Sequence, residues 1–223
     1  MKKILVVTCS KDDGKSSKLV QSLNDIKDDV SLVINANNSD GLSKAYNKQL
    51  DAENLIKHDI VLFVHDDVYI DDLKLKGKLY SAIHNLKYDI VGLAGASQIE
   101  VKKPCLWHKM SAREDWSGAV SHPVNDEKEL AVSSFGAWPK RCLVMDGLFL
   151  AVNLQRVLEV GWKFNENYTY HHYDISSCLD ANAMKLKMGT YPIWVTHQSP
   201  GLKNIKDKTF KQSEDIFYNE YGQ

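Results

Sequence analysis

The sequence predicts an α/β protein of three layers, in which a mostly parallel central sheet lies between layers of helices. Apolar runs alternate with segments of helical periodicity through the first hundred residues. Those apolar runs are continuous, as in strands that are buried on both faces. The chain has 223 residues and a mass of 25.3 kDa, which is enough for one domain with its own core.

The elements of the first half follow in a regular order. Continuous apolar runs predict strands over residues 3–10, 30–37, 59–64 and 89–97. Apolar residues three or four positions apart predict helices between them, over residues 15–26, 39–55 and 72–86. Strands that alternate with helices in this way pair in parallel, because each helix carries the chain back across the sheet.

The second half is less regular. Residues 98–140 contain three prolines and three tryptophans with weak periodicity, and they predict an irregular insertion over one end of the sheet. Residues 141–154 predict a strand pair, or one bent strand, around Asp146 and Gly147. Two helices closed by Gly161 and Gly189, and a last strand ending at His197, complete the pattern.

Composition excludes several classes of protein. Lys and Arg number 28 against 29 Asp and Glu, so no overall positive field attracts nucleic acid. The 4 cysteines are scattered without a C-x-x-C pair, which is typical of reduced, packed thiols in a cytosolic protein. No apolar run approaches the roughly 18 residues of a membrane-spanning helix. The chain also lacks a P-loop and a G-x-G-x-x-G motif, which argues against kinases and dehydrogenases.

Polar residues follow several predicted strands, at the edge where open α/β sheets bind ligands. They are Thr8, Ser10, Asn35, Asn37, Asp66, Asp67, Ser97 and His197. The adjacent carboxylates of Asp66 and Asp67 repel each other, and a bound cation would relieve that repulsion. Oxygen ligands favour Mg²⁺ or Mn²⁺, to which a nucleotide diphosphate could add further oxygens. The alternative is a solvated loop, or a cap of the next helix.

Five segments carry a resemblance to a known family. They are GLSKAYNKQLDAE (41–53), LFVHDDVYI (62–70), VMDGLFLAVN (144–153), YHHYDISSCLDANAMKLKMG (170–189) and VTHQSPG (195–201). In this order they resemble glycosyltransferases of the GT-A fold, and most closely the family-2-like group of small bacterial enzymes. The resemblance spans Ile4 to Gly201 and implies one Rossmann-like GT-A domain over residues 1–223. Residues 1–97 would form its nucleotide-binding half, residues 98–201 its acceptor-binding half and residues 202–223 a C-terminal tail.

The resemblance also implies roles for individual residues. Expected nucleotide contacts are Thr8, Ser10, Asn35, Asn37, Asn47 and Asp66. Asp67 is the expected metal ligand, with His197 completing the metal shell, because His65 stands where many relatives have a carboxylate. Asp174 aligns with the catalytic base; its alternative role is to cap a helix.

Further residues are expected to contact the sugar or the acceptor. Asp146 and Gly147 match a turn that faces these substrates, and His172 lies just before the expected base. Trp116, like Trp107 and Trp138, offers a ring that could stack on a sugar face. The alternative for any one of these tryptophans is packing beneath the insertion.

The expected function is metal-dependent transfer of a sugar from a nucleoside-diphosphate sugar to a hydroxyl of a carbohydrate or lipid-linked acceptor, with Mn²⁺ or Mg²⁺, in bacterial polysaccharide biosynthesis. One carboxylate base without a covalent nucleophile predicts inversion at the anomeric carbon. One alternative is a non-catalytic nucleotide- or carbohydrate-binding protein on a degenerate GT-A scaffold. Another is a nucleotidyltransferase or phosphohydrolase. The sequence predicts a cytoplasmic protein with at most peripheral contact with the inner face of the membrane.

Overall fold

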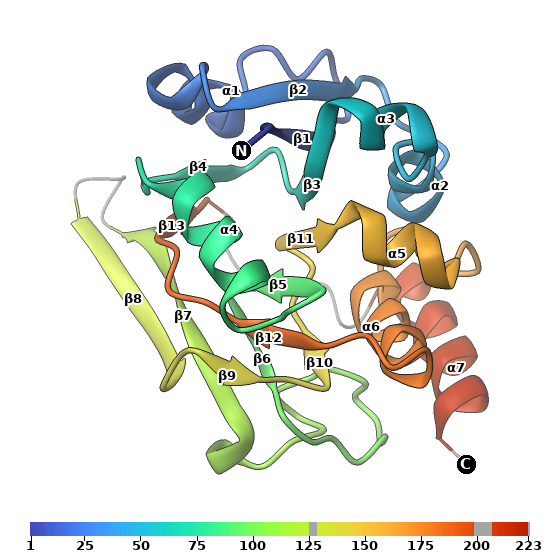
Figure 1. Cartoon of the computed structure of the whole chain (residues 1–223). Coiled ribbons are helices and arrows are strands. Elements are labelled where there is room, and N and C mark those ends of the chain that lie inside the picture. The colour runs from blue at the N-terminus through green and yellow to red at the C-terminus, as the bar shows by residue number, and fades with distance from the viewer. Residues whose placement is uncertain (125–128, 199–206, 223) are drawn as a thin grey trace.

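Two β-sheets pack on one hydrophobic core (Figure 1). The computed structural model describes residues 1–124, 129–198 and 207–222. Within them, a seven-stranded sheet has the order β2 (Val30–Asn35), β1 (Lys3–Cys9), β3 (His58–Val64), β11 (Phe149–Asn153), β5 (Ile90–Gly92), β12 (Met188–Thr190) and β9 (Lys140–Arg141). A six-stranded sheet has the order β10 (Val144–Met145), β6 (Ala94–Ala96), β7 (Trp116–Val124), β13 (Val195–His197) and β4 (Val68–Ile70), with β8 (Glu129–Gly136) paired to β7.

The central sheet is mixed, so the prediction of a mostly parallel sheet is wrong. β1 pairs in parallel with β2 and β3, and β5 pairs in parallel with β12. β11 runs antiparallel between β3 and β5, and β9 runs antiparallel beside β12. The chain reaches β11 from β10, a strand of the six-stranded sheet, and not through a crossover helix of the kind that joins parallel strands.

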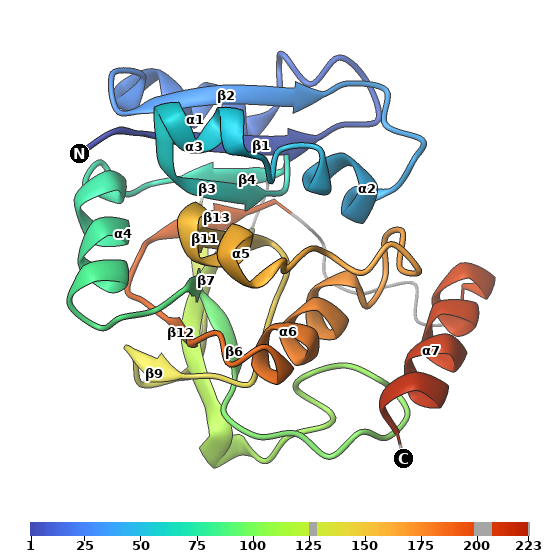
Figure 2. The same ribbon diagram turned by 45° about the vertical axis from the view of Figure 1, so that its right-hand side comes forward.

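Short helices pack on both sheets. They are α1 (Lys18–Leu23), α2 (Leu42–Asn47), α3 (Ala52–Lys57), α4 (Leu75–His84), α5 (Leu154–Val160), α6 (Tyr173–Ala183) and the 3₁₀ turn η1 (Asn24–Ile26). α3 and α5 pack against β3, and Figure 2 shows them together on one face of the sheet. The apolar run Ile4–Val7 of β1 is at most 2% exposed, as predicted for a strand covered on both faces.

Residues 98–140 are more regular than predicted. The irregular description holds for residues 98–112, which lead into the 3₁₀ turn η2 (Arg113–Asp115). β7 and β8 then pair as long antiparallel strands at one side of the molecule (Figure 1). These strands lack a clear alternation of apolar and polar residues, because β7 is covered by its neighbours while most of β8 is exposed. Tertiary packing therefore set a pattern that periodicity does not reveal.

The C-terminal tail contains one helix, α7 (Lys208–Tyr221), which lies beside α6 in both views of the ribbon. The Asp207 carboxylate caps it by accepting a hydrogen bond from the backbone N–H of Thr209. Phe210 and Phe217 of α7 are buried, and their rings pack against that of His172, at centroid distances of 4.8 and 5.6 Å. The predicted boundary between residues 201 and 202 lies outside the described residues. No helix in the described part of the chain has the length and apolar character needed to cross a membrane.

Candidate active site

The turn after β3 presents the His65-Asp66-Asp67 motif at the end of the sheet. The backbone of this turn is held by hydrogen bonds from His65 N to Leu148 O and from Val68 N to His65 O, at 3.1 and 3.3 Å. His197 ends β13, which pairs with β4 so that His197 lies opposite Val68. The pairing of β4 with β13 therefore places His197 beside a motif more than a hundred residues earlier in the chain.

His65, Asp67 and His197 form a group that could hold a metal ion. One possible ligand atom from each residue lies within 4.8 Å of those of the other two. Asp67 Oδ1 and His197 Nε2 are 3.3 Å apart, and neither of these buried atoms has a hydrogen-bond partner among the described residues. Buried polar atoms that face each other without hydrogen bonds fit a cation bound between them. The residues present thus fit a divalent metal.

Burial and the neighbouring charges have opposite effects on the pKa values of Asp67 and His197. Burial disfavours the charged form of Asp67, but the interaction with His197 outweighs it and lowers the pKa of the carboxyl. Burial likewise favours a neutral His197, yet the neighbouring Asp67 raises the pKa of that imidazole. Burial lowers the pKa of His65, so this ring is neutral near pH 7 and keeps a lone pair for a ligand.

Asp67 borders two cavities. The smaller has a volume of about 300 Å³ and is lined by Ser10, Asp12, Ser16, Ser17, Lys18, Asp66 and Asp67. It combines hydroxyls, a cation and carboxylates at the end of β1 and the start of α1. These groups suit a polar, phosphorylated ligand that also binds a metal.

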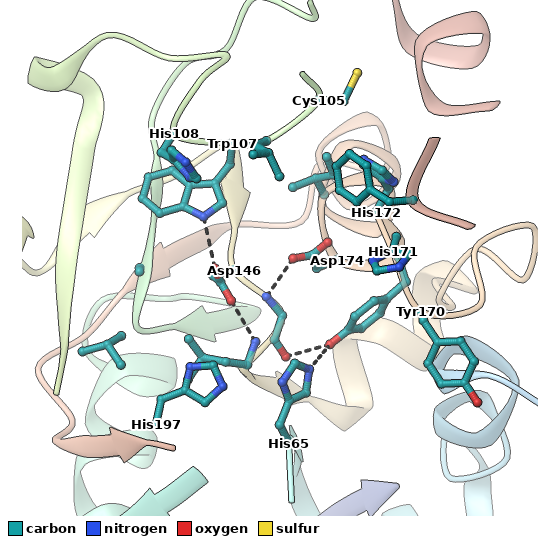
Figure 3. Close-up of a pocket in the computed structure, with 18 of the residues that line it drawn as sticks. His65, Cys105, Trp107, His108, Asp146, Tyr170, His171, His172, Asp174 and His197 are labelled. Atoms are coloured by element: carbon teal, nitrogen blue, oxygen red, sulfur yellow. Dashed lines mark hydrogen bonds between the residues drawn. The ribbon is translucent and has the colours of Figure 1, made fainter. Parts of the chain in front are cut away.

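The larger cavity has a volume of about 380 Å³ and lies between the stretch 105–108 and the start of α6 (Figure 3). Its floor carries His65, Asp67, Asp146, Asp174 and His197, while its walls are mainly apolar and aromatic. The wall residues include Leu106, Trp107, Phe135, Tyr170 and Phe210. A polar floor beneath apolar walls can bind a sugar ring, because a pyranose has both hydroxyls and an apolar face.

The turn between β10 and β11 brings Asp146 to this floor, and the start of α6 brings Asp174. Asp146 accepts hydrogen bonds from Leu148 N and from Trp107 Nε1, at 3.1 and 3.2 Å. Gly147 N donates to Asp174 Oδ2 at 2.9 Å. A Cβ at position 147 would lie 2.4 Å from Tyr173 Oη, so only glycine fits there without displacement of α6.

Asp174 is the carboxylate with the properties of a general base. It stands in the first turn of α6, and its carboxylate accepts hydrogen bonds from the backbone N–H groups of Ile175 and Gly147. Burial, and then the nearby negative charge of Asp146, raises the pKa of Asp174 from 3.8 to about 7. A carboxyl with a pKa near neutrality exchanges protons readily at neutral pH.

The other expected nucleotide contacts lie around the ends of β1 and β2. Ser10 Oγ donates to Asp12 at 2.9 Å within the smaller cavity, and Thr8 is fully buried below it. Asn35 Nδ2 donates to Thr8 O at 3.1 Å, while Asn37 is exposed with a positive φ of 51°. Ser10 and Asp66 alone among the six expected contacts line a cavity.

Two expected site residues face elsewhere. The side chain of Asn47 is bonded to Phe164 N and O, so it ties α2 to the loop before α6 and lines neither cavity. Trp116 is bonded to Ser111 Oγ and packs behind Trp107, which takes the place at the wall. His172 does line the larger cavity, with Nδ1 2.9 Å from Ser213 Oγ.

Several lining residues had no assigned role in the sequence. Tyr173 and Phe210 line the larger cavity, and Phe210 comes from α7. Their only signal in the sequence was an aromatic ring near an expected site residue, and most aromatic residues belong to the core.

Comparison with known proteins identifies the fold. No protein-family model matches the chain, and no curated protein matches its sequence. The solved structures that resemble it include a mannosyltransferase, so the chain has a glycosyltransferase-like fold. Because the sequence identities are low, the likeness shows the fold alone.

The particular structures differ in how much of them is matched. Mannosyltransferase PcManGT from Pyrobaculum calidifontis, in complex with GDP-Man and Mn²⁺, has a TM-score of 0.57 and 10% identity, over 100% of this chain and 65% of that chain. TarS 1-349 from S. aureus has a TM-score of 0.49 and 13% identity, over 89% and 61%. A197 from STIV has a TM-score of 0.48 and 16% identity, over 84% and 81%. This chain thus spans less than two thirds of PcManGT and of TarS 1-349.

Proposed function

We propose that the protein is a metal-dependent glycosyltransferase that uses a nucleoside-diphosphate sugar. One observation carries the proposal: Asp67 lies between a polar cavity and a cavity that contains Asp174, and it belongs to a group able to hold a metal. The nucleotide would occupy the smaller cavity, with contacts from Ser10 and Asp66. The sugar and the acceptor would meet in the larger one.

A divalent ion held by His65, Asp67 and His197 would stabilise the negative charge on the departing diphosphate. His197 binds such an ion as a neutral ligand, so the ion takes the place of the proton that Asp67 favours on this ring. Two imidazole ligands favour a transition metal such as Mn²⁺ over Mg²⁺, which prefers oxygen. The likeness to a mannosyltransferase complexed with GDP-Man and Mn²⁺ supports this choice.

The chain supplies the remaining chemistry. Asp174 would accept the proton of the acceptor hydroxyl, and the hydrogen bond from Gly147 N orients its carboxylate for this. Asp146 is held by two donors and keeps Trp107 at the wall, beside the sugar. With one base and no covalent nucleophile, the reaction would invert the anomeric carbon.

Finer assignments rest on the sequence. Thr8, Asn35 and Asn37 would contact the nucleoside, as the sequence predicts, although none of them lines the smaller cavity. Gly147 and His172 would border the acceptor, a carbohydrate or a lipid-linked saccharide. Membership of the family-2-like bacterial group, a role in polysaccharide biosynthesis and a cytoplasmic location stay predictions.

The test is binding followed by turnover. The protein is titrated with GDP-mannose and UDP-glucose, with and without Mn²⁺, and release of nucleoside diphosphate is then measured with saccharide acceptors. We expect Mn²⁺-dependent binding and diphosphate release, and Asp174→Asn should bind the donor without transfer. The matched control is Asp28→Asn, an exposed aspartate that lines neither cavity.

Other results would redirect the proposal. Donor binding without turnover in the wild-type protein would favour the non-catalytic alternative. Release of nucleoside monophosphate or inorganic phosphate would favour the nucleotidyltransferase or phosphohydrolase. Full transfer activity in Asp174→Asn would remove its role as the base.

A further inference from the structure

The hydroxyl of Tyr173 joins two parts of the site. Its Oη lies 2.9 Å from His65 Nε2 and 2.8 Å from Gly147 O. Tyr173 is 3% exposed, and its ring packs against those of Tyr46 and Phe164. A tyrosine phenol carries a single proton at neutral pH, since its ordinary pKa is about 10.

The direction of these two hydrogen bonds follows from counting protons. A backbone carbonyl can only accept, so the one phenolic proton must point to Gly147 O. The contact with His65 is satisfied only if Nε2 carries a hydrogen and donates to the phenol oxygen. A neutral imidazole carries one N–H, which leaves the lone pair on Nδ1.

We propose that Tyr173 is a positioning residue that holds His65 as the Nε2–H tautomer and so leaves Nδ1 to bind the metal. This inference deepens the proposed function and rests on it, because His65 needs this orientation only if the site binds a metal. Ligand histidines in proteins are commonly oriented by a hydrogen bond at the second ring nitrogen. Here a tyrosine and a backbone carbonyl provide that bond.

The same contacts connect the metal group to Asp174. Gly147 accepts from Tyr173 through its carbonyl and donates to Asp174 Oδ2 through its N–H. A continuous chain of hydrogen bonds thus runs from His65 through Tyr173 and Gly147 to Asp174, and the dashed lines of Figure 3 connect His65 with Asp174. A shift of α6 would move the base and reorient the metal ligand together.

The test replaces the hydroxyl and keeps the ring. Tyr173→Phe removes both hydrogen bonds and preserves the aromatic contacts. Tyr46→Phe is the matched control, because Tyr46 is buried in the same cluster and its hydroxyl has no hydrogen-bond partner among the described residues. Both variants and the wild type are prepared metal-free with ¹⁵N-labelled histidine. Long-range ¹H–¹⁵N spectra then report the tautomer of His65, and Mn²⁺ titration reports the affinity.

We expect His65 to be Nε2–H in the wild type and in Tyr46→Phe, and to become a mixture of tautomers in Tyr173→Phe. Mn²⁺ affinity should fall about 10- to 100-fold in Tyr173→Phe, as for the loss of other groups that orient metal ligands, and should not change in Tyr46→Phe. An Nδ1–H tautomer in the wild type, or an unchanged tautomer in Tyr173→Phe, overturns the proposal. So does equal Mn²⁺ affinity in Tyr173→Phe and the wild type.

Failure of the proposed function would look different. If the wild type binds no Mn²⁺ but binds and turns over a nucleotide sugar, the metal-dependent mechanism is wrong and the role of Tyr173 in metal binding falls with it. If the wild type binds Mn²⁺ through His65 but no nucleotide sugar, the proposed reaction is wrong while Tyr173 keeps its role.

Discussion

Replacement of Asp174 by asparagine tests whether the candidate base is held in an environment that opposes its charge. The structure raises the pKa of Asp174 from 3.8 to about 7. Between these values the folded protein keeps a proton that the unfolded chain has lost. By linkage, the free energy of unfolding contributed by Asp174 falls as the pH rises through this window. Asparagine does not ionise and lacks this contribution.

The magnitude follows from the size of the shift. At about 1.36 kcal/mol for each pKa unit, a shift of roughly 3 units corresponds to at most ~4 kcal/mol. Because the Asp174 side chain is partly accessible to solvent, which weakens the effect, we expect about 2 kcal/mol or somewhat more. The wild type should therefore lose that much stability relative to Asp174→Asn between pH 4.5 and pH 8.

The assay is urea unfolding at a series of fixed pH values, followed by tryptophan fluorescence, with a chelator present so that bound metal does not contribute. Equal m-values for the two proteins would show that the same surface is exposed on unfolding. Asp28→Asn controls for loss of a surface charge, since Asp28 is exposed. If the free energies of unfolding of Asp174→Asn and wild type instead differ by the same amount at every pH, a buried environment that opposes the charge of Asp174 is refuted.

Three further predictions concern the same site. Transfer activity should rise with pH through about 7 as Asp174 loses its proton, which a pH–rate profile measures; a profile flat between pH 5.5 and 8.5 contradicts this. Gly147→Ala should destabilise the protein by about 1–3 kcal/mol in urea unfolding, because the new Cβ would lie 2.4 Å from Tyr173 Oη. Unchanged stability would mean that α6 can shift without a cost in free energy. Mn²⁺ at about 100 times its Kd should stabilise the wild type by ~2.7 kcal/mol, and should stabilise Asp67→Asn much less. Thermal unfolding with and without Mn²⁺ measures this, and equal shifts in the two proteins exclude Asp67 as a ligand.

The sequence predicted the strand ends better than it predicted the sheet. The apolar run before His65 and the carboxylates after it define where β3 stops, because burial and charge are local properties of the chain. The direction of β11 is not local. It depends on the position in space at which the insertion ends, and the residues around Phe149 do not indicate that position. The regular pairing of β7 with β8 escaped prediction for the same reason, since neighbouring strands determine which faces are buried.

By itself the sequence determined that the protein is α/β and that acidic and histidine side chains follow its strands. The tertiary structure decided which of them meet. His65 and Tyr173 are separated by 108 positions, and they touch because β3 ends and α6 begins at the same cavity. Asn47, expected from the family pattern, and Trp116, expected from its ring, face other partners, because a side chain's direction depends on how its element is packed. Residue types and their order establish the available chemistry, whereas register and packing establish the distances on which that chemistry depends.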